Sequence, residues 1–255
     1  MRAAAGCVVG LSAAGRPRCG FTWSRAGHIK RTIVLFSDFE RACYNDTVAT
    51  KGTATRRQIL LRAADLASAE GLEGLSIGRL SEALGMSKSG LFAHFGSKEE
   101  LQLAVLETAR DLFAAEVLAP AAAEPPGLSR LVAVVQGWLR HVEHPVFRGG
   151  CFFAAAAAEW DDRPGRVRDR VVAITRQWFS ELETGLLEAA ARGHLRADSD
   201  AAQLAFELHA FLHAANLAYQ LHGDAQVFAR ARSAIRRVLL PLTHEHHTHV
   251  LDDLA

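Results

Sequence analysis

Serine and glycine stand at short intervals in the first half of the chain, at positions that typically begin and end helices. Ser76 can cap a helix that Gly85 ends, because a serine hydroxyl accepts a backbone hydrogen bond and glycine readily adopts the left-handed conformation of a C-cap. Ser87 then begins a third helix, and the capping box SKEE, from Ser97 to Glu100, begins a fourth. Two short helices joined by so tight a turn predict a helix-turn-helix.

Helical periodicity also extends through the rest of the chain. Ala, Leu, Arg and Glu dominate the composition and only 7% of the residues are aromatic, which favours helices over strands. The spacing of apolar residues predicts a first helix from Thr55 to Gly71. Further helices are predicted over about 128–143, 150–160, 164–192, 199–221 and 225–239. We therefore predict an all-α fold, in which a three-helix helix-turn-helix domain precedes a helical bundle.

The charge is distributed unevenly along the chain, although the net charge is only +1. Residues 1–50 carry 7 Lys and Arg against 3 Asp and Glu, and residues 51–98 carry 7 against 4. Residues 99–255 carry 15 against 21. A basic first part joined to an acidic remainder indicates that any binding of a polyanion is confined to the first hundred residues.

The exposed start of the third helix is the candidate nucleic-acid surface, because the second helix of a helix-turn-helix enters the major groove of DNA. Leu91 and Phe95 should face inward and hold this helix on its neighbours. Lys98, at the start of the fourth helix, can hold a phosphate, and Arg56 and Arg57 can add backbone contacts. Small or polar candidates around the turn are Ser76, Ser87, Lys88, Ser89 and Gly90.

The stretch "TRRQILLRAADLASAEGLEGLSIGRLSEALGMSKSGLFAHFGSKEELQLAVLE" resembles the DNA-binding domain of the TetR family of bacterial transcriptional regulators. The resemblance implies a DNA-binding domain over residues 51–107 and a helical effector-binding and dimerisation domain over 108–240. It also implies repression by a homodimer that sits on a palindromic operator and is released by an unidentified small-molecule effector. Phe92 stands where the family usually carries tyrosine, so one phosphate contact is lost or is replaced by His94.

The predicted helix over 199–221 is apolar on nearly all sides, which is typical of a helix buried on two faces. One face can pack within its own chain and the other against the same helix of a second chain. The aromatic and polar residues of the C-terminal helices are candidates for an effector pocket, although each one alone is more often a core residue. These candidates are Trp138, Phe147, Phe152, Phe153, Trp160, Trp178, Phe179, His209, His213 and Asn216.

Both ends of the chain differ from its middle. Residues 1–50 are predicted to be poorly ordered, either as a basic arm or as sequence upstream of a start at Val48, since bacterial GTG start codons encode valine when read internally. Residues 241–255 are predicted to be a flexible His-rich tail. Its imidazoles invite a metal hypothesis, but no framework fixes their geometry, so we predict no metal site. The acidic run EWDD, residues 159–162, is interpreted as a solvated loop.

The rival functional classes are an all-α enzyme and a scaffold without DNA affinity. The chain carries no Gly-rich phosphate loop, no HExxH and no GxSxG, so no catalytic residue and no cofactor is predicted. Its four cysteines are far apart and without C-x-x-C pairing, which indicates neither zinc nor a disulfide framework. No run approaches the length of a membrane span, and the cytoplasm is the expected location.

Overall fold

The computed structural model describes residues 10–11, 17–18 and 51–254, with side chains from residue 55 onward. The strands β1 (Gly10–Leu11) and β2 (Pro17–Arg18) pair antiparallel. From residue 51 onward the described chain is built from helices, which confirms the all-α prediction. Apart from the two strands, the prediction for residues 1–50 lies outside the described residues. No helix in the described part is long and apolar enough to cross a membrane.

The helix-turn-helix forms as the capping residues predict. It consists of α2 (Lys51–Glu70), α3 (Ile77–Leu84) and α4 (Lys88–Phe95). The Ser76 hydroxyl accepts from the Arg79 N–H at 3.2 Å, and the Ser87 hydroxyl accepts from the Gly90 N–H at 3.1 Å. Gly85 ends α3 at φ +63°, a left-handed conformation that favours glycine.

A long helix leads away from this module. It runs as α5 (Lys98–Phe113), then as a π-helical turn η2 (Ala114–Leu118), then as α6 (Ala119–Ala121). Half of the predicted capping box is present, because the Ser97 hydroxyl accepts from the Glu100 N–H at 3.1 Å. The Glu100 carboxylate instead accepts from Arg166 at 2.6 Å.

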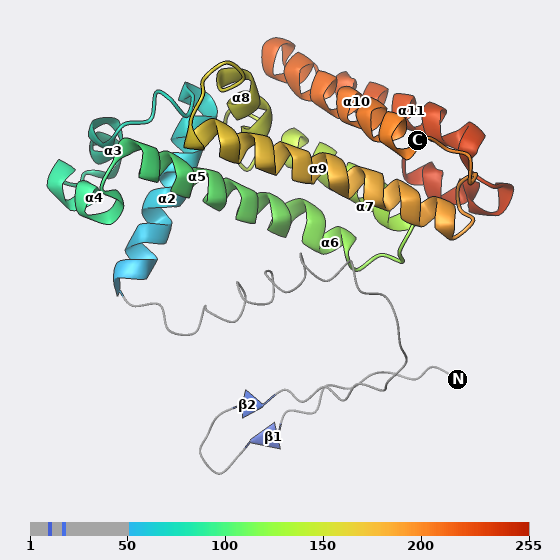
Figure 1. Cartoon of the computed structure of the whole chain (residues 1–255), viewed down its shortest axis with the longest axis horizontal. Coiled ribbons are helices and arrows are strands. Elements are labelled where there is room, and N and C mark those ends of the chain that lie inside the picture. The colour runs from blue at the N-terminus through green and yellow to red at the C-terminus, as the bar shows by residue number, and fades with distance from the viewer. Residues whose placement is uncertain (1–9, 12–16, 19–50, 255) are drawn as a thin grey trace. The chain divides into compact units, whose positions relative to one another are not determined.

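Five further helices complete the bundle, and their bounds lie within a few residues of the prediction. They are α7 (Leu128–Glu143), α8 (Phe152–Glu159), α9 (Arg166–Ala191), α10 (Ala201–His222) and α11 (Gln226–Leu239). In Figure 1, α5 and α9 run side by side between the α3–α4 end and the α10–α11 pair. The helix α9 contacts α5, α7, α8 and α10, so it connects most of the bundle.

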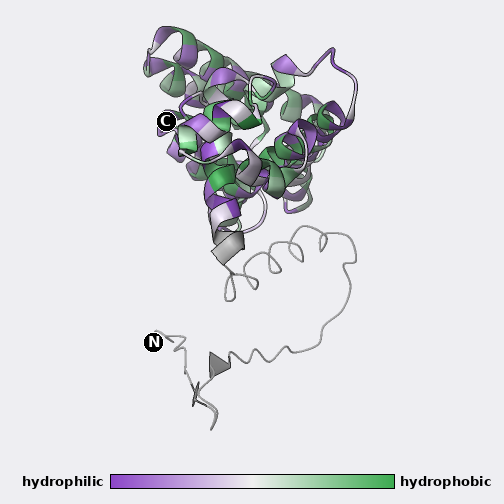
Figure 2. Ribbon diagram, turned by 90° about the vertical axis from the view of Figure 1, so that its left-hand side faces the viewer, coloured by the Kyte–Doolittle hydropathy of each residue, from purple (hydrophilic) through white to green (hydrophobic). Residues whose placement is uncertain are grey.

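Two apolar cores lie within the helices. The first joins α2–α5 to Phe147, Phe152 and Trp160 and to the start of α9. The second fills the space between α7, α9, α10 and α11. Figure 2 shows polar and apolar residues interspersed along the helices, as amphipathic helices that share a core require. Since residues of α8 and of the loops on either side of it belong to the first core, the helix-turn-helix and the bundle are packed together rather than joined by a loose linker.

The C-terminal segment differs from the predicted flexible tail. It folds as η3 (Leu240–Leu242) and a 3-10 helix η4 (Glu245–Leu254) that packs on α7 and α11. Leu251 and Leu254 are fully buried, which anchors the segment on the second core. The His247 ring stacks on His194 at 4.3 Å between centroids. Among the described residues, no three His, Cys, Asp or Glu side chains are grouped so as to hold a metal ion.

We predict that Leu251→Ala lowers the free energy of unfolding by about 2–5 kcal/mol, the usual cost of truncating a buried leucine. Urea denaturation followed by circular dichroism measures this change. His249→Ala, an exposed residue of the same 3-10 helix, is the matched control and should change stability by less than about 0.5 kcal/mol. Equal stability of the two variants would contradict the anchoring role of Leu251.

Candidate functional site

The helix α4 is held by two buried side chains and presents its other face to solvent. Leu91 is fully buried and Phe95 is 7% exposed, as the sequence predicts. Phe92, on the opposite face, is 54% exposed. An exposed aromatic side chain at this position suits apolar contact with a thymine methyl group in a major groove.

The polar residues predicted for DNA binding gather around the start of α4. The Ser87 and Ser89 hydroxyl oxygens are 3.3 Å apart, and both residues are exposed with Lys88 between them. Lys88 forms no ion pair among the described residues. Arg56, near the start of α2, places its guanidinium 5.1 Å from the centre of the Phe95 ring, which brings a cation close to α4.

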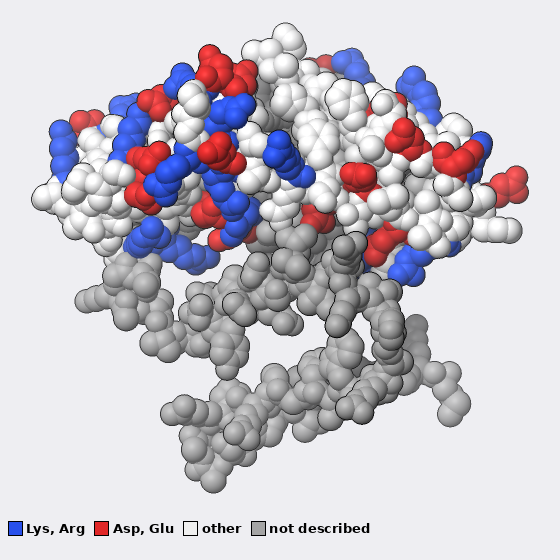
Figure 3. Space-filling model, viewed as in Figure 1, with Lys and Arg blue, Asp and Glu red and all other residues white. Residues whose placement is uncertain are grey.

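The other residues predicted to contact DNA lie near these side chains. Ser76 and Gly90 are partly buried at the starts of α3 and α4, His94 is partly buried on α4, and Arg57 is exposed on α2. Figure 3 shows charged side chains of both signs crowded over α5 and the start of α9, while the left end of this face, where α3 and α4 lie, is mostly uncharged.

Lys98 is engaged within the protein. Its ammonium donates to the Glu73 carboxylate at 2.7 Å, and Arg163 lies 3.9 Å from the same carboxylate. The hydrogen bond from Lys98 holds the pKa of Glu73 below its usual value. A phosphate at Lys98 must compete with this carboxylate. Lys98 is therefore a weaker candidate for a DNA contact than Lys88.

A carboxylate from the bundle holds the loop between α2 and α3. The Glu159 carboxylate, at the end of α8, accepts from the Leu72 N–H at 2.7 Å and from the Glu73 N–H at 2.8 Å. The interpretation of EWDD as a solvated loop is therefore wrong for Glu159, although Asp161 is exposed. Gly71 adopts φ +86°, which would strain any other residue, and a Cβ there would lie 2.8 Å from the same carboxylate and displace it.

A second junction lies one turn earlier on α2. Arg148 donates to the Asp65 carboxylate at 3.0 Å, and the Gly149 N–H donates to the Ser68 hydroxyl at 3.2 Å. A Cβ on Gly149 would lie 1.8 Å from the Ser68 carbonyl oxygen, so glycine is required for this close approach. The loop before α8 is thus hydrogen-bonded to α2, and the end of α8 is hydrogen-bonded to the loop that follows α2.

Several predicted effector-pocket residues form one aromatic cluster. Phe147, Phe152 and Phe153 are linked by ring contacts at 5.8 and 5.5 Å. The Trp178 indole N–H donates to the His209 Nδ1 at 3.2 Å. The His209 ring also contacts Phe179 at 4.5 Å and His213 at 5.5 Å.

Two residues that the sequence analysis did not select join these groups. Phe113, at the end of α5, makes edge contacts with Phe153 and Trp178 at 6.3 and 5.4 Å, and with His141 at 5.6 Å. His141 is buried and its Nδ1 has no hydrogen-bond partner in the described structure. Both residues occupy core-facing positions of amphipathic helices, as ordinary core residues do. No local sequence signal therefore distinguishes them as members of the cluster.

Three of the predicted pocket residues lie apart from the cluster. Trp138 is buried in the second core, and Trp160 packs in the first core beneath the Arg163 guanidinium. The Asn216 side-chain oxygen accepts from the Cys151 N–H at 3.0 Å, so it fixes the start of α8. These residues have packing or capping roles in this structure.

Burial controls protonation in the aromatic cluster. Burial, with the neighbouring His213 ring, lowers the pKa of His209 to about 4. Burial likewise lowers the pKa of His141. Both imidazoles are therefore neutral near pH 7. Because His209 Nδ1 already accepts from Trp178, its Nε2 carries the proton and can only donate to a ligand, whereas His141 has an Nδ1 without a described partner.

Together these features define a helix-turn-helix module packed on a helical bundle, and comparisons with known proteins give its family. A family model described as "Bacterial regulatory proteins, tetR family" matches residues 59–105. Another, described as "Tetracyclin repressor-like, C-terminal domain", matches residues 127–235. The chain belongs to the TetR family of bacterial regulators, which confirms the resemblance found in the sequence.

Individual relatives agree with this assignment. The HTH-type transcriptional repressor AcnR of Corynebacterium glutamicum is 44% identical over 55 residues, which span 22% of this chain and 29% of that repressor. The crystal structure of a TetR transcriptional regulator from Chloroflexus aurantiacus is 28% identical, with a TM-score of 0.64 over 79% of this chain and 94% of that one. The crystal structure of AibR in complex with isovaleryl coenzyme A and operator DNA is 24% identical, with a TM-score of 0.59, and covers 73% of this chain and 98% of that one. This last similarity supports the fold alone.

We predict that Glu159→Ala destabilises the protein by about 1–3 kcal/mol, because the Leu72 and Glu73 amides lose their partner in a partly buried loop. Urea denaturation measures the change. Asp161→Ala removes an exposed carboxylate two residues away and is the matched control. Glu159→Ala and Asp161→Ala variants of equal stability would show that the carboxylate does not hold the loop.

Proposed function

We propose that the protein is a homodimeric transcriptional repressor that binds a palindromic operator through α4 and leaves it when a small-molecule effector binds among the C-terminal helices. Its place of action is then the cytoplasm, where bacterial DNA is found. The observation that carries the proposal is the start of α4, where Ser87, Lys88 and Ser89 are exposed to solvent. The opposite face of the helix is held in the core by the buried side chains of Leu91 and Phe95. This arrangement suits insertion into a major groove.

The proposed dimer uses a stripe of apolar residues along α10, defined by Phe206, Ala210, Ala214, Leu217 and Leu221. Its three large members are 53–68% exposed, and they recur at helical spacing on one side of the helix. A contiguous exposed apolar stripe on a folded chain is typical of a protein interface. Pairing of two such stripes about a two-fold axis can place two copies of α4 one DNA turn, about 34–36 Å, apart.

The proposed effector response passes through α8. Phe152 and Phe153, at its start, belong to the aromatic cluster, and Glu159, at its end, holds the loop between α2 and α3. An effector that displaces aromatic rings of the cluster moves α8, and α8 carries the loop with it. Only an effector with different affinities for the bound and free arrangements can shift the equilibrium in this way.

The first test is a mobility-shift assay of the full chain on the DNA immediately upstream of its own gene. Competitor DNA is present in excess, and the assay is run at two salt concentrations. A complex that resists competitor supports an operator-binding repressor. The logarithm of its binding constant should fall with the logarithm of salt, because phosphate neutralisation releases counterions. Absence of affinity for any DNA at low salt would refute the proposal and favour a scaffold or an enzyme.

We predict that Lys88→Ala weakens operator binding by about 1–3 kcal/mol, since its ammonium stands exposed beside the start of α4 and is not engaged by a carboxylate of the described structure. Fluorescence anisotropy with labelled operator measures the affinity. Lys98→Ala is the matched control and should cost less, because Glu73 already engages that lysine. A larger loss for Lys98→Ala than for Lys88→Ala would place the DNA surface at α5 instead.

We predict that Leu217→Glu converts the dimer into a monomer and weakens operator binding at least tenfold, because two buried carboxylates would face each other across the interface. Analytical ultracentrifugation gives the mass, and anisotropy gives the affinity. Leu187→Glu is the matched control, because Leu187 is 54% exposed on α9 and Leu217 is 53% exposed. A dimer that survives Leu217→Glu and dissociates with Leu187→Glu would move the interface to α9.

A further inference from the structure

A groove between α2 and α5 lies outside the aromatic cluster. Its volume is about 400 Å³, within the range of about 300–1,000 Å³ that is usual for small-molecule sites. Its walls come from one face of each helix and from the π-helical turn that follows α5. The lining residues are Arg56, Arg57, Leu60, Leu61, Thr108, Asp111, Leu112 and Ala115.

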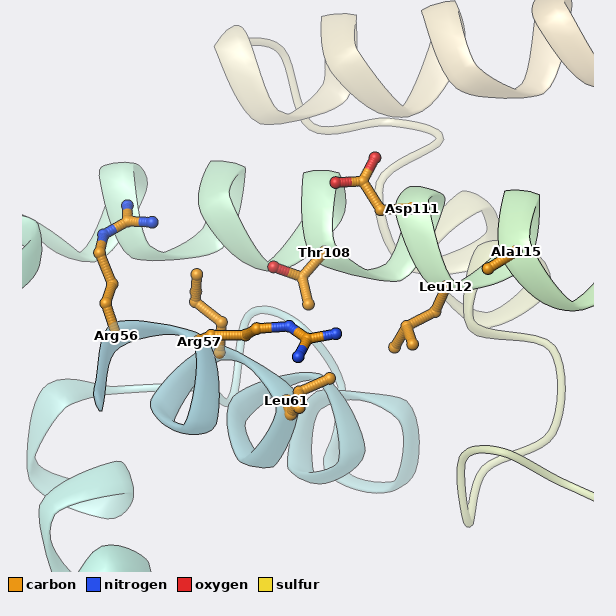
Figure 4. A pocket seen from close by; sticks show the side chains of 8 residues that line it. Arg56, Arg57, Leu61, Thr108, Asp111, Leu112 and Ala115 are labelled. Carbon is orange, nitrogen blue, oxygen red and sulfur yellow. The ribbon is translucent and has the colours of Figure 1, made fainter. Parts of the chain in front are cut away.

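The groove combines cations with an apolar wall. Figure 4 shows the Arg57 side chain extending along the groove between the two helices, with Leu61 and Leu112 beside it. Arg56 lies at the end near the start of α2. Neither arginine forms an ion pair with any residue that the structure describes.

The one carboxylate in the lining is turned to other partners. Figure 4 shows the Asp111 carboxylate pointing away from α2. It lies 2.8 Å from the Arg110 guanidinium, which offsets its charge. The Thr108 hydroxyl donates to the Ala104 carbonyl oxygen at 2.9 Å. The groove is therefore electropositive at its arginine end and apolar along Leu112 and Ala115.

We propose that this groove binds an amphipathic carboxylate, with the carboxylate on the Arg57 guanidinium and the aliphatic chain along Leu61, Leu112 and Ala115. Guanidinium and carboxylate form charge-assisted hydrogen bonds in bidentate geometry, which are stronger than neutral ones. The aliphatic part gains the free energy of leaving water against the leucines. An uncharged aliphatic chain would not pair with the Arg57 guanidinium, and a short carboxylate would not cover the apolar wall.

Such a ligand weakens DNA binding, and this consequence depends on the proposed function. Arg56 and Arg57 are the proposed phosphate contacts at the start of α2, and a bound carboxylate occupies the charge that a phosphate needs. The two ligands then weaken each other's binding by the same factor. No movement of α8 is required, so this site acts independently of an effector in the aromatic cluster.

The test uses sodium decanoate, below its micellar concentration, and decanol as the uncharged match. Isothermal titration calorimetry on the full chain is expected to show one decanoate site per chain, with binding at least about tenfold weaker for decanol. Arg57→Ala should weaken decanoate binding by about the same factor. Ala115→Phe fills the far end of the groove from an exposed position and should abolish binding. Fluorescence anisotropy should show decanoate reducing operator affinity for the parent chain but not for Ala115→Phe.

The outcomes separate this proposal from the proposed function. Normal operator binding that decanoate leaves unchanged, together with no heat of binding, would overturn the groove proposal and leave the repressor standing. Decanoate binding that survives both Arg57→Ala and Ala115→Phe would place the ligand elsewhere and also overturn it. Decanoate binding that both variants remove, in a chain without affinity for DNA, would support the groove and refute the repressor.

Discussion

One carboxylate holds the loop from which the two short helices of the helix-turn-helix follow. Glu159 ends α8 and accepts hydrogen bonds from two consecutive backbone amides of the loop between α2 and α3. Without this carboxylate the two amides would have no protein partner in a partly buried loop, which would cost about 1–3 kcal/mol in total. Gly71 makes the approach possible because it has no side chain and adopts φ +86°. Since α3 follows this loop directly and α4 follows α3, we expect a displacement of α8 to be transmitted to the proposed DNA-binding surface.

Packing carries more of this linkage than the surface ion pairs do. Arg166 pairs with Glu99 and Glu100 across the α5–α9 boundary, but its side chain is 61% exposed, and such pairs typically contribute about 0–1 kcal/mol. In contrast, Phe152 is buried in the same apolar core as Leu91. An effector that rearranges the rings beside Phe152 therefore acts on a continuous packed core, and cores respond to volume changes of even one methylene group.

The sequence predicts what is encoded locally and misses what distant contacts decide. The caps at Ser76, Ser87 and Ser97 each involve residues three positions apart, so the helix-turn-helix and the helix bounds could be predicted. The partners of Glu159 lie 87 and 86 residues away, and nothing near EWDD reveals them. The C-terminal 3-10 helix is held chiefly by Leu251 and Leu254, and with Val250 it has only three apolar residues in a mostly polar stretch, which is too few to produce a periodicity. Whether an aromatic residue joins the cluster depends on helix packing, which periodicity does not give.

The cations around the helix-turn-helix fall into two groups, and the division explains where regulation can act. Arg79 and Lys98 are paired with Glu70 and Glu73, so their charge is used within the fold. Lys88, Arg56 and Arg57 have no such partner among the described residues, and these are the charges that we propose contact DNA. Arg56 and Arg57 also line the groove between α2 and α5. A carboxylate bound at Arg57, as we propose, would therefore compete with a phosphate for the charge at the start of α2, and this competition would require no change in the bundle.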